Sequence, residues 1–172
     1  MPTIGVALAI PEPWATQLQD YRTALGDETA TRIPTHVTLV PPTEVRDDEL
    51  SGIDEHLAAT AGRCRAFDVH LRGTGTFRPV SPVVFVTLAE GIGGCEELAH
   101  AVRRGPLDVP LTFPYHPHVT VAHHLSDETL DRAFAELATF ECVFTVERFH
   151  LYRHEDHAGW RPTSAYPLGG TA

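Results

Sequence analysis

Two hydrophobic patterns alternate along the chain. Segments whose apolar residues recur at every second position, or follow one another without interruption, predict strands, whereas apolar residues three or four positions apart predict helices. By this criterion we expect strands at about residues 3–10, 35–40, 67–72, 83–88, 118–121, 142–153 and 160–168. We expect helices at about residues 13–25, 47–61, 92–104 and 126–137.

Prolines, glycines and a short polar side chain mark several of the expected boundaries. Pro13 suits the first turn of a helix, where its missing N–H would have no partner in any case. The Pro-Pro pair at 41–42 is expected to end the second strand, and the Gly-Thr-Gly segment at 73–75 is expected to form a turn. Ser126 is expected to cap the last helix at its N-terminus.

The balance of these elements favours an α+β fold. The helices are too few, and the strands too amphipathic, for a doubly wound parallel sheet. We expect two mostly antiparallel sheets with flanking helices, related by a pseudo-twofold axis around a central cleft. Residues 1 to about 88 are expected to build one lobe, and the second half is expected to repeat the same order. No low-complexity linker divides the halves, so residues 1–172 are interpreted as a single bilobal domain.

One short phrase occurs twice within the strand-like segments. The two copies are His36-Val37-Thr38-Leu39 and His118-Val119-Thr120-Val121. From the composition, the tripeptide His-Val-Thr is expected only about 0.1 times in a chain of this length, so two occurrences are informative. The copies start at positions 36 and 118 of 172 residues, a spacing close to half the chain, which suggests an internal duplication.

The motif places a proton-transfer group beside a hydroxyl. On a strand, side chains alternate between the two faces, so the histidine and the threonine of each copy share one face while the apolar residues enter the core. Two such pairs at one pocket would supply a general base, a general acid and two donors to a charged oxygen. The sequence therefore predicts His36 and His118 as catalytic residues, and Thr38 and Thr120 as phosphate-binding residues, of a phosphoesterase without a metal or other cofactor. Either histidine could be the base, because an ordinary imidazole pKa is about 6.5.

With these motifs, the chain resembles the two-histidine (2H) phosphoesterase superfamily, and within it the bacterial 2′-5′ RNA ligase-like proteins. The resemblance also covers the N-terminal strand, the segment 73–77 and the closing Tyr166-Pro167-Leu168. It implies a bilobal fold, no metal, and activity on 2′,3′-cyclic phosphates or 2′-5′ linkages. Related sequences often have a basic residue just after the second motif, where this chain has Val121-Ala122-His123-His124.

The main hypothesis is a metal-independent phosphodiesterase, a hydrolase of RNA processing that acts on 2′,3′-cyclic or 2′-5′ phosphodiesters of nucleotides or RNA ends. Ligation of RNA ends is the alternative within enzymes, because both directions share one transition state. A catalytically silent module that binds RNA ends or nucleotides is a second alternative. A metal-binding protein is the third, since His116, His118 and His123 are close in sequence, although no nearby cysteine or carboxylate completes a familiar zinc site.

Other residues are candidates for additional substrate contacts. The aromatic candidates for stacking on a base are Phe77, Tyr115 and Trp160, of which Tyr115 precedes the second motif most closely. The basic candidates for an anion contact are Arg78, Arg153 and Arg161. For each arginine, a solvated surface charge is the simpler interpretation.

Composition and charge restrict the class of substrate that the protein can bind. At 172 residues and 42% hydrophobic content, the chain can bury a proper core. The formal net charge of -10 argues against a protein that coats long nucleic acid, because phosphate contacts normally need an excess of lysine and arginine. A nucleotide or an RNA terminus remains compatible, since a few local donors can hold one anionic group. We expect a monomer.

The N-terminal segment and the cysteines indicate the cellular compartment. The N-terminus has no basic segment, and its apolar run is too short for a signal peptide or a membrane span. The three cysteines, Cys64, Cys95 and Cys142, are isolated and suit a reducing compartment. We therefore expect a cytoplasmic protein with no membrane partner.

Overall fold

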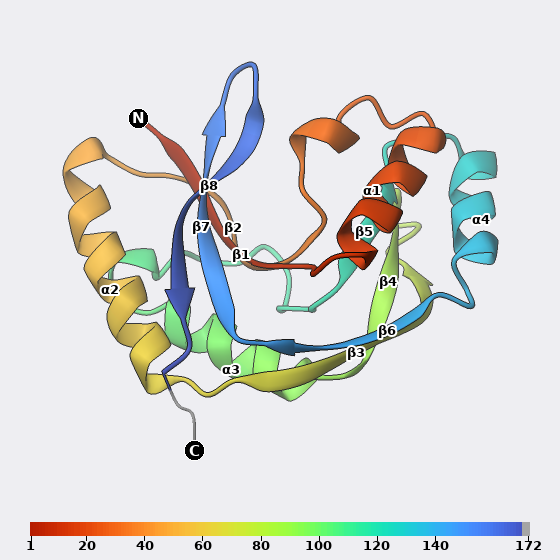
Figure 1. Cartoon of the computed structure of the whole chain (residues 1–172). Coiled ribbons are helices and arrows are strands. Elements are labelled where there is room, and N and C mark those ends of the chain that lie inside the picture. Colours follow the sequence, from red (N-terminus) through yellow and green to blue (C-terminus); the bar gives the residue numbers. More distant parts are fainter. Residues whose placement is uncertain (170–172) are drawn as a thin grey trace.

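The computed structural model describes residues 1–169 and has an α+β fold with two four-stranded sheets (Figure 1). The strands are β1 (Thr3–Ala9), β2 (His36–Glu44), β3 (Phe67–Thr76), β4 (Val83–Glu90), β5 (Val119–His123), β6 (Glu141–Val146), β7 (Arg148–Glu155) and β8 (Gly159–Pro167). The helices are α1 (Trp14–Ala24), α2 (Leu50–Arg63), α3 (Ile92–Val102) and α4 (Asp127–Glu136). The fold class predicted from the sequence is confirmed.

Each sheet carries one motif strand at its edge. The first sheet has the order β2-β1-β7-β8, the second has the order β5-β4-β3-β6, and all neighbouring strands are antiparallel. Strand β2 begins at His36, and β5 begins one residue after His118. The two motifs therefore occupy equivalent positions, each on an outer strand that pairs with one inner strand.

The expectation that each half of the chain builds one lobe is wrong. Strands β3 and β4 lie in the second sheet, while β7 and β8 join β1 and β2 in the first. The single strand expected at 142–153 is two strands, because β6 pairs with β3 and β7 pairs with β1. Figure 1 shows β6 and β7 following one another from one sheet to the other. Periodicity identifies a strand but not its partner, so the sequence pattern could not reveal this exchange.

Two expected chain breaks lie inside strands. Strand β2 continues through the Pro-Pro pair at 41–42 to Glu44. Prolines are tolerated there because β2 is an edge strand, whose outward-facing backbone needs no ladder N–H. The Gly-Thr-Gly segment belongs to β3, where pairing with β4 is irregular between Leu71 and Thr74 and Gly73 has a φ of 77°. This positive φ favours glycine, so the segment is a bulge within the strand and not a turn.

Two helices pack across the boundary between the lobes. Helix α1 follows β1 of the first sheet but contacts β5 of the second, and α3 follows β4 of the second sheet but contacts β2 of the first. The buried residues of α1 are Leu18 and Arg22, which are four positions apart and share one helix face. This packing directs Arg22 toward the second motif strand.

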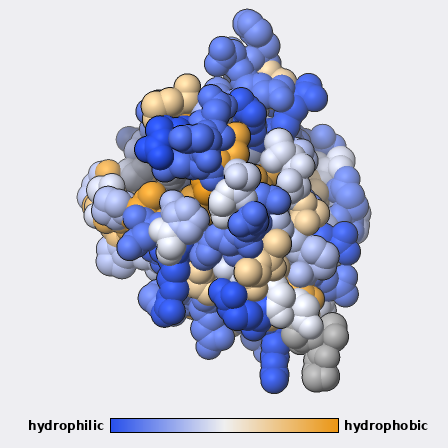
Figure 2. All heavy atoms as spheres, turned by 90° about the vertical axis from the view of Figure 1, so that its left-hand side faces the viewer, coloured by the Kyte–Doolittle hydropathy of each residue, from blue (hydrophilic) through white to orange (hydrophobic). Residues whose placement is uncertain are grey.

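The apolar positions of the sequence pattern lie mostly inside the molecule. Figure 2 shows the side at the left of Figure 1, where hydrophilic side chains predominate and hydrophobic atoms appear in small separate patches. Among residues 1–169, no helix is both long and apolar enough to cross a membrane.

Candidate active site

The motif strands present their polar side chains on one face. The apolar residues Val37, Leu39, Val119 and Val121 are fully buried. The polar residues His36, Thr38, His118 and Thr120 are half-buried. The alternation of faces predicted from the sequence is therefore confirmed in both copies.

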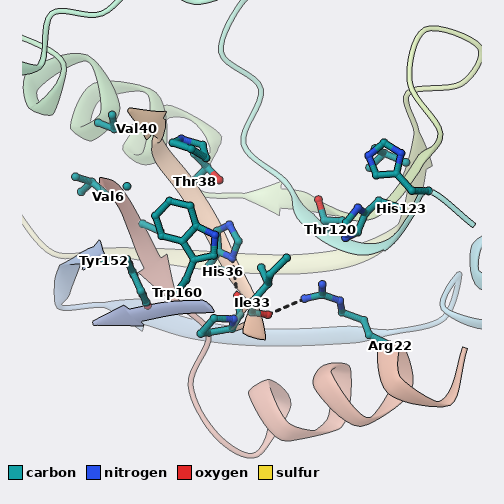
Figure 3. Close-up of a pocket in the computed structure, with 16 residues that line it drawn as sticks. Val6, Arg22, Ile33, His36, Thr38, Val40, Thr120, His123, Tyr152 and Trp160 are labelled. Atoms are coloured by element: carbon teal, nitrogen blue, oxygen red, sulfur yellow. Dashed lines mark hydrogen bonds between the residues drawn. The ribbon is translucent and has the colours of Figure 1, made fainter. Parts of the chain in front are cut away.

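A cavity of about 430 Å³ lies between the two motif strands. Its walls include His36 and Thr38 from β2, and Thr120 and His123 from β5. Figure 3 shows Thr38 and Thr120 on opposite sides of this space, with Trp160 beside His36. The remaining motif residue, His118, is not among the lining residues and lies at the end of the loop that enters β5.

The two motif histidines are held in the same way. The Nδ1 atom of His36 lies 2.6 Å from the carbonyl oxygen of Pro34, and Nδ1 of His118 lies 2.7 Å from that of His116. A carbonyl oxygen only accepts, so each Nδ1 carries the hydrogen and donates it. In both rings Nε2 is therefore the nitrogen that remains able to accept or donate a proton.

The surroundings of both histidines favour the neutral imidazole. Burial lowers the pKa of His36, the bond to Pro34 opposes this, and the positive charge of Arg22 adds to the lowering. Burial likewise lowers the pKa of His118, and the charges of His116 and His36 lower it further. A positive charge on His36 thus disfavours a second positive charge on His118.

Two phenylalanines support the His118 ring. Its centroid lies 4.9 Å from that of Phe77 and 5.2 Å from that of Phe85, and the two phenylalanine centroids are 4.5 Å apart. A Cβ atom at Gly75 would come within 2.7 Å of the Phe85 ring, so glycine is required for this close approach. The bulged segment of β3 therefore leaves room for the Phe85 ring, which packs against His118.

Arg22 of α1 lines the cavity and forms a buried ion pair with Asp27, which follows the helix. Arg22 is 2% exposed and lines the cavity, and its Nη2 lies 3.2 Å from Oδ2 of Asp27. Its Nη1 donates to the carbonyl oxygen of Ile33 at 3.0 Å, which Figure 3 marks with a dashed line. The same Asp27 oxygen lies 3.6 Å from Nε2 of His123. A cation and an imidazole from different lobes thus share one buried carboxylate.

Tyr115 and the three arginines predicted as contacts lie outside the cavity lining. The Tyr115 hydroxyl donates to the carbonyl oxygen of Thr38 at 2.7 Å, and the Arg103 guanidinium lies 5.5 Å from the Tyr115 ring centroid. Arg78 forms an ion pair of 2.9 Å with Asp131. The last two predicted contacts, Arg153 and Arg161, face each other across the β7–β8 hairpin, and Arg161 pairs with Glu155 at 3.2 Å.

Sequence reasoning missed Arg22 and Asp27. The available signal was weak: Arg22 stands four positions after Leu18, on the face of the helix that should be buried. A charged residue at a core position of a helix is unusual unless it is paired or functional. Trp160, one of the stacking candidates, does line the cavity.

The residues described by the structure contain no group of three or more His, Cys, Asp or Glu side chains that could hold a metal ion. The cluster of His116, His118 and His123, considered from the sequence, is therefore not assembled as a ligand set. His123 instead faces Asp27.

Comparison with known proteins points to one family. The model of a family described as the 2′-5′ RNA ligase superfamily matches residues 10–158. A protein of Bacillus licheniformis that is provisionally named a phosphoesterase is 31% identical over 141 residues, which is 80% of this chain and 82% of that protein.

Solved structures share the fold. TT0787 of Thermus thermophilus has a TM-score of 0.75 and 23% identity over the full length of both chains. LigT of E. coli, crystallised with 3′-AMP, has a TM-score of 0.69 and 21% identity over 97% of this chain and 98% of that one.

Proposed function

This chain belongs to the 2′-5′ RNA ligase superfamily of phosphoesterases, and from that premise we propose that it hydrolyses 2′,3′-cyclic or 2′-5′ phosphodiesters of nucleotides or RNA ends. In this proposal His36 and His118 are the acid-base pair, and Thr38 and Thr120 bind the phosphate.

The matched hydrogen bonding of the two histidines carries the proposal. Each ring donates Nδ1–H to the carbonyl oxygen two residues before it, which fixes the ring orientation and leaves Nε2 for chemistry. Acid-base catalysis at phosphorus needs two such groups, one to take a proton and one to give a proton. A purely structural histidine would not need the same arrangement at two equivalent strand ends.

The residues suggest the following course for a 2′,3′-cyclic phosphate. One neutral imidazole accepts a proton at Nε2 from a water molecule as the water oxygen bonds to phosphorus. The bond from phosphorus to one ribose oxygen breaks, and the protonated partner imidazole donates its Nε2 proton to that oxygen. The Thr38 and Thr120 hydroxyls donate to the non-bridging oxygens, where charge increases in the transition state. The product is a phosphate monoester beside a free hydroxyl.

An aromatic wall supports a nucleotide as substrate. Trp160 lines the cavity beside His36, and its ring lies 3.5 Å from the position that a Cβ of Gly5 would take. A base can stack on such a ring, a contact worth about 1–3 kcal/mol. The LigT structure with 3′-AMP is consistent with a nucleotide ligand in this fold.

The charge of the chain supports a small or terminal substrate. With 13 arginines and no lysine against 23 aspartates and glutamates, the protein lacks the cationic surface that long nucleic acids require. Because one chain contains both motifs, a monomer suffices for the proposed reaction.

Turnover of 2′,3′-cyclic mononucleotides in excess EDTA tests the proposal. His36→Ala and His118→Ala should each lower kcat by about 10²–10⁴, and the double variant should lose far less than the product of the two effects, since the residues act as a unit. His157→Ala, which changes an exposed histidine in the β7–β8 turn, is the matched control and should retain full activity.

Four outcomes would contradict the proposal. One is full activity in either motif variant. A second is activity that EDTA removes and a divalent metal restores, which would make the reaction metal-dependent. The third is binding of the cyclic nucleotide without turnover by the wild-type protein, which would identify a binding module. With RNA ends as substrates, accumulation of a 2′-5′-joined product would assign ligation in place of hydrolysis.

A further inference from the structure

We infer that Arg22, positioned by Asp27, is a phosphate-binding residue of this site and that the substrate phosphate must therefore be anionic. This inference rests on the proposed function, which it deepens by adding a cation that neither motif contains. It comes from the placement, burial and hydrogen bonding of the Arg22 side chain.

The guanidinium lies where an anion would bind. Arg22 projects from α1 between the two motif strands and lines the same cavity as His36, Thr38 and Thr120. The positive charge of Arg22 also acts on His36, because it adds to the effect of burial in lowering the pKa of that histidine. Burial in a water-poor site strengthens the attraction between such a charge and a phosphate.

Arg22 keeps donors that the protein does not use. A guanidinium has five N–H donors in a planar fork. Within residues 1–169, Nη1 bonds to the Ile33 carbonyl oxygen and Nη2 to Asp27, while the buried Nε has no partner. Each Nη atom therefore retains one N–H, and this planar group suits the oxygens of a phosphate.

Asp27 holds the Arg22 guanidinium but occupies only one of its Nη atoms. Its Oδ1 accepts bonds from the Thr29 backbone N–H at 2.9 Å and from the Thr29 hydroxyl at 2.6 Å. Its Oδ2 contacts Arg22 at 3.2 Å and lies 3.6 Å from His123. The carboxylate is thus shared among three residues and meets Arg22 through one oxygen, so it fixes the arginine yet does not form the two-bond pair that would occupy both Nη atoms.

Titration calorimetry with inorganic phosphate tests the inference without requiring turnover. Arg22→Lys keeps the charge but loses the planar fork, so the Kd for phosphate should rise about 3- to 10-fold. Arg22→Met should raise it at least about 10-fold, the value of 1.4 kcal/mol. Since Arg22→Met leaves Asp27 buried without its partner, the protein could fail to fold. The double variant Arg22→Met/Asp27→Leu removes both charges, and replacing a buried pair by apolar residues is often tolerated.

Kinetic measurements separate a binding role from a structural one. Arg22→Lys and Asp27→Asn should raise KM for an anionic 2′,3′-cyclic nucleotide more than they change kcat, measured at a temperature at which both variants are folded. Arg132→Met, which removes a surface cation paired with Glu136 on α4, is the control and should leave both KM and the phosphate Kd unchanged.

The outcomes distinguish this inference from the proposed function. If the folded double variant binds phosphate as tightly as the wild type, Arg22 is a structural residue and the inference is overturned. If the wild type binds phosphate through Arg22 but no cyclic nucleotide is turned over, the inference stands and the proposed reaction fails. In both experiments His36→Ala is the comparison variant, because it changes the proposed acid-base pair and leaves Arg22 in place.

Discussion

The hydroxyl of Tyr115 links the two motif regions, and removing it should weaken both the fold and the reaction. Tyr115 lies in the loop that leads to His118, and its hydroxyl donates to the carbonyl oxygen of Thr38 at 2.7 Å. Burial raises the pKa of Tyr115, so the hydroxyl stays protonated and can donate throughout the neutral range. Because β2 is an edge strand, a carbonyl on its outer side has no neighbouring strand to bond with.

The expected magnitude follows from this geometry. Tyr115→Phe leaves a partly buried carbonyl without its donor, which should cost about 1–3 kcal/mol of unfolding free energy. For a protein of this size, each kcal/mol lowers Tm by about 2–4 °C. Loss of the link also frees Thr38 relative to the second motif, so we expect kcat to fall by about 10-fold, or 1.4 kcal/mol, with KM little changed.

Urea unfolding and steady-state kinetics with a 2′,3′-cyclic nucleotide measure both effects. Tyr21→Phe is the matched control, because its hydroxyl contacts Glu136 at 3.2 Å on the surface, and its loss should cost less than about 0.5 kcal/mol. If Tyr115→Phe is as stable and as active as the control variant, the link between the motifs has no energetic role. If Tyr115→Phe is unaffected but Tyr115→Ala raises KM, the ring stacks on the substrate instead.

Three further predictions concern the hydroxyls, the protonation of the motif and a buried thiol. Thr38→Val and Thr120→Val should each lower kcat by about 10- to 100-fold, or 1.4–2.7 kcal/mol, and kinetics that match the wild type would remove their phosphate-binding role. Burial lowers the pKa values of His36 and His118 in the folded state, whereas a histidine in the unfolded chain has a pKa of about 6.5. Below about pH 6.5 the unfolded chain therefore binds more protons than the folded protein. The contribution of these two groups to stability is therefore complete above that pH and is lost as the pH falls toward their folded-state pKa values. The free energy of unfolding of the His36→Gln/His118→Gln variant should depend less steeply on pH. An equal slope in urea unfolding at a series of pH values would refute this. Burial raises the pKa of Cys95 to about 12, so mass spectrometry after alkylation at pH 8 should find Cys95 unlabelled in the native protein and labelled in urea, and rapid native labelling would show that the thiol is accessible.

Local features were within reach of the sequence because they depend on neighbours along the chain. Strand alternation put the histidine and threonine of each motif on one face, since side chains of a strand necessarily alternate. Ser126 was recognised as a helix cap, and its hydroxyl does accept the Thr129 N–H at 3.2 Å. These features follow from backbone geometry and from hydrogen bonds that span only a few residues.

Features that depend on distant partners were decided by the tertiary structure. The Pro-Pro pair at 41–42 fits within β2 because that strand is an edge strand, a fact fixed by pairing and not by the local sequence. Gly75 looked like part of a turn, whereas it makes room for the Phe85 ring behind His118.

The site shows the same division between sequence and structure. The sequence by itself identified the candidate reactive groups, because a histidine and a threonine two positions apart on a strand share one face, and the pair occurs twice. Only the fold brought Arg22 to the cavity and paired it there with Asp27, because α1 follows a strand of one sheet but packs against β5 of the other. Hydrophobic periodicity records whether a position is buried but not what it is buried against, so a charged residue on the inner face of a helix acquires its partner, and its role, from the packing of the whole chain.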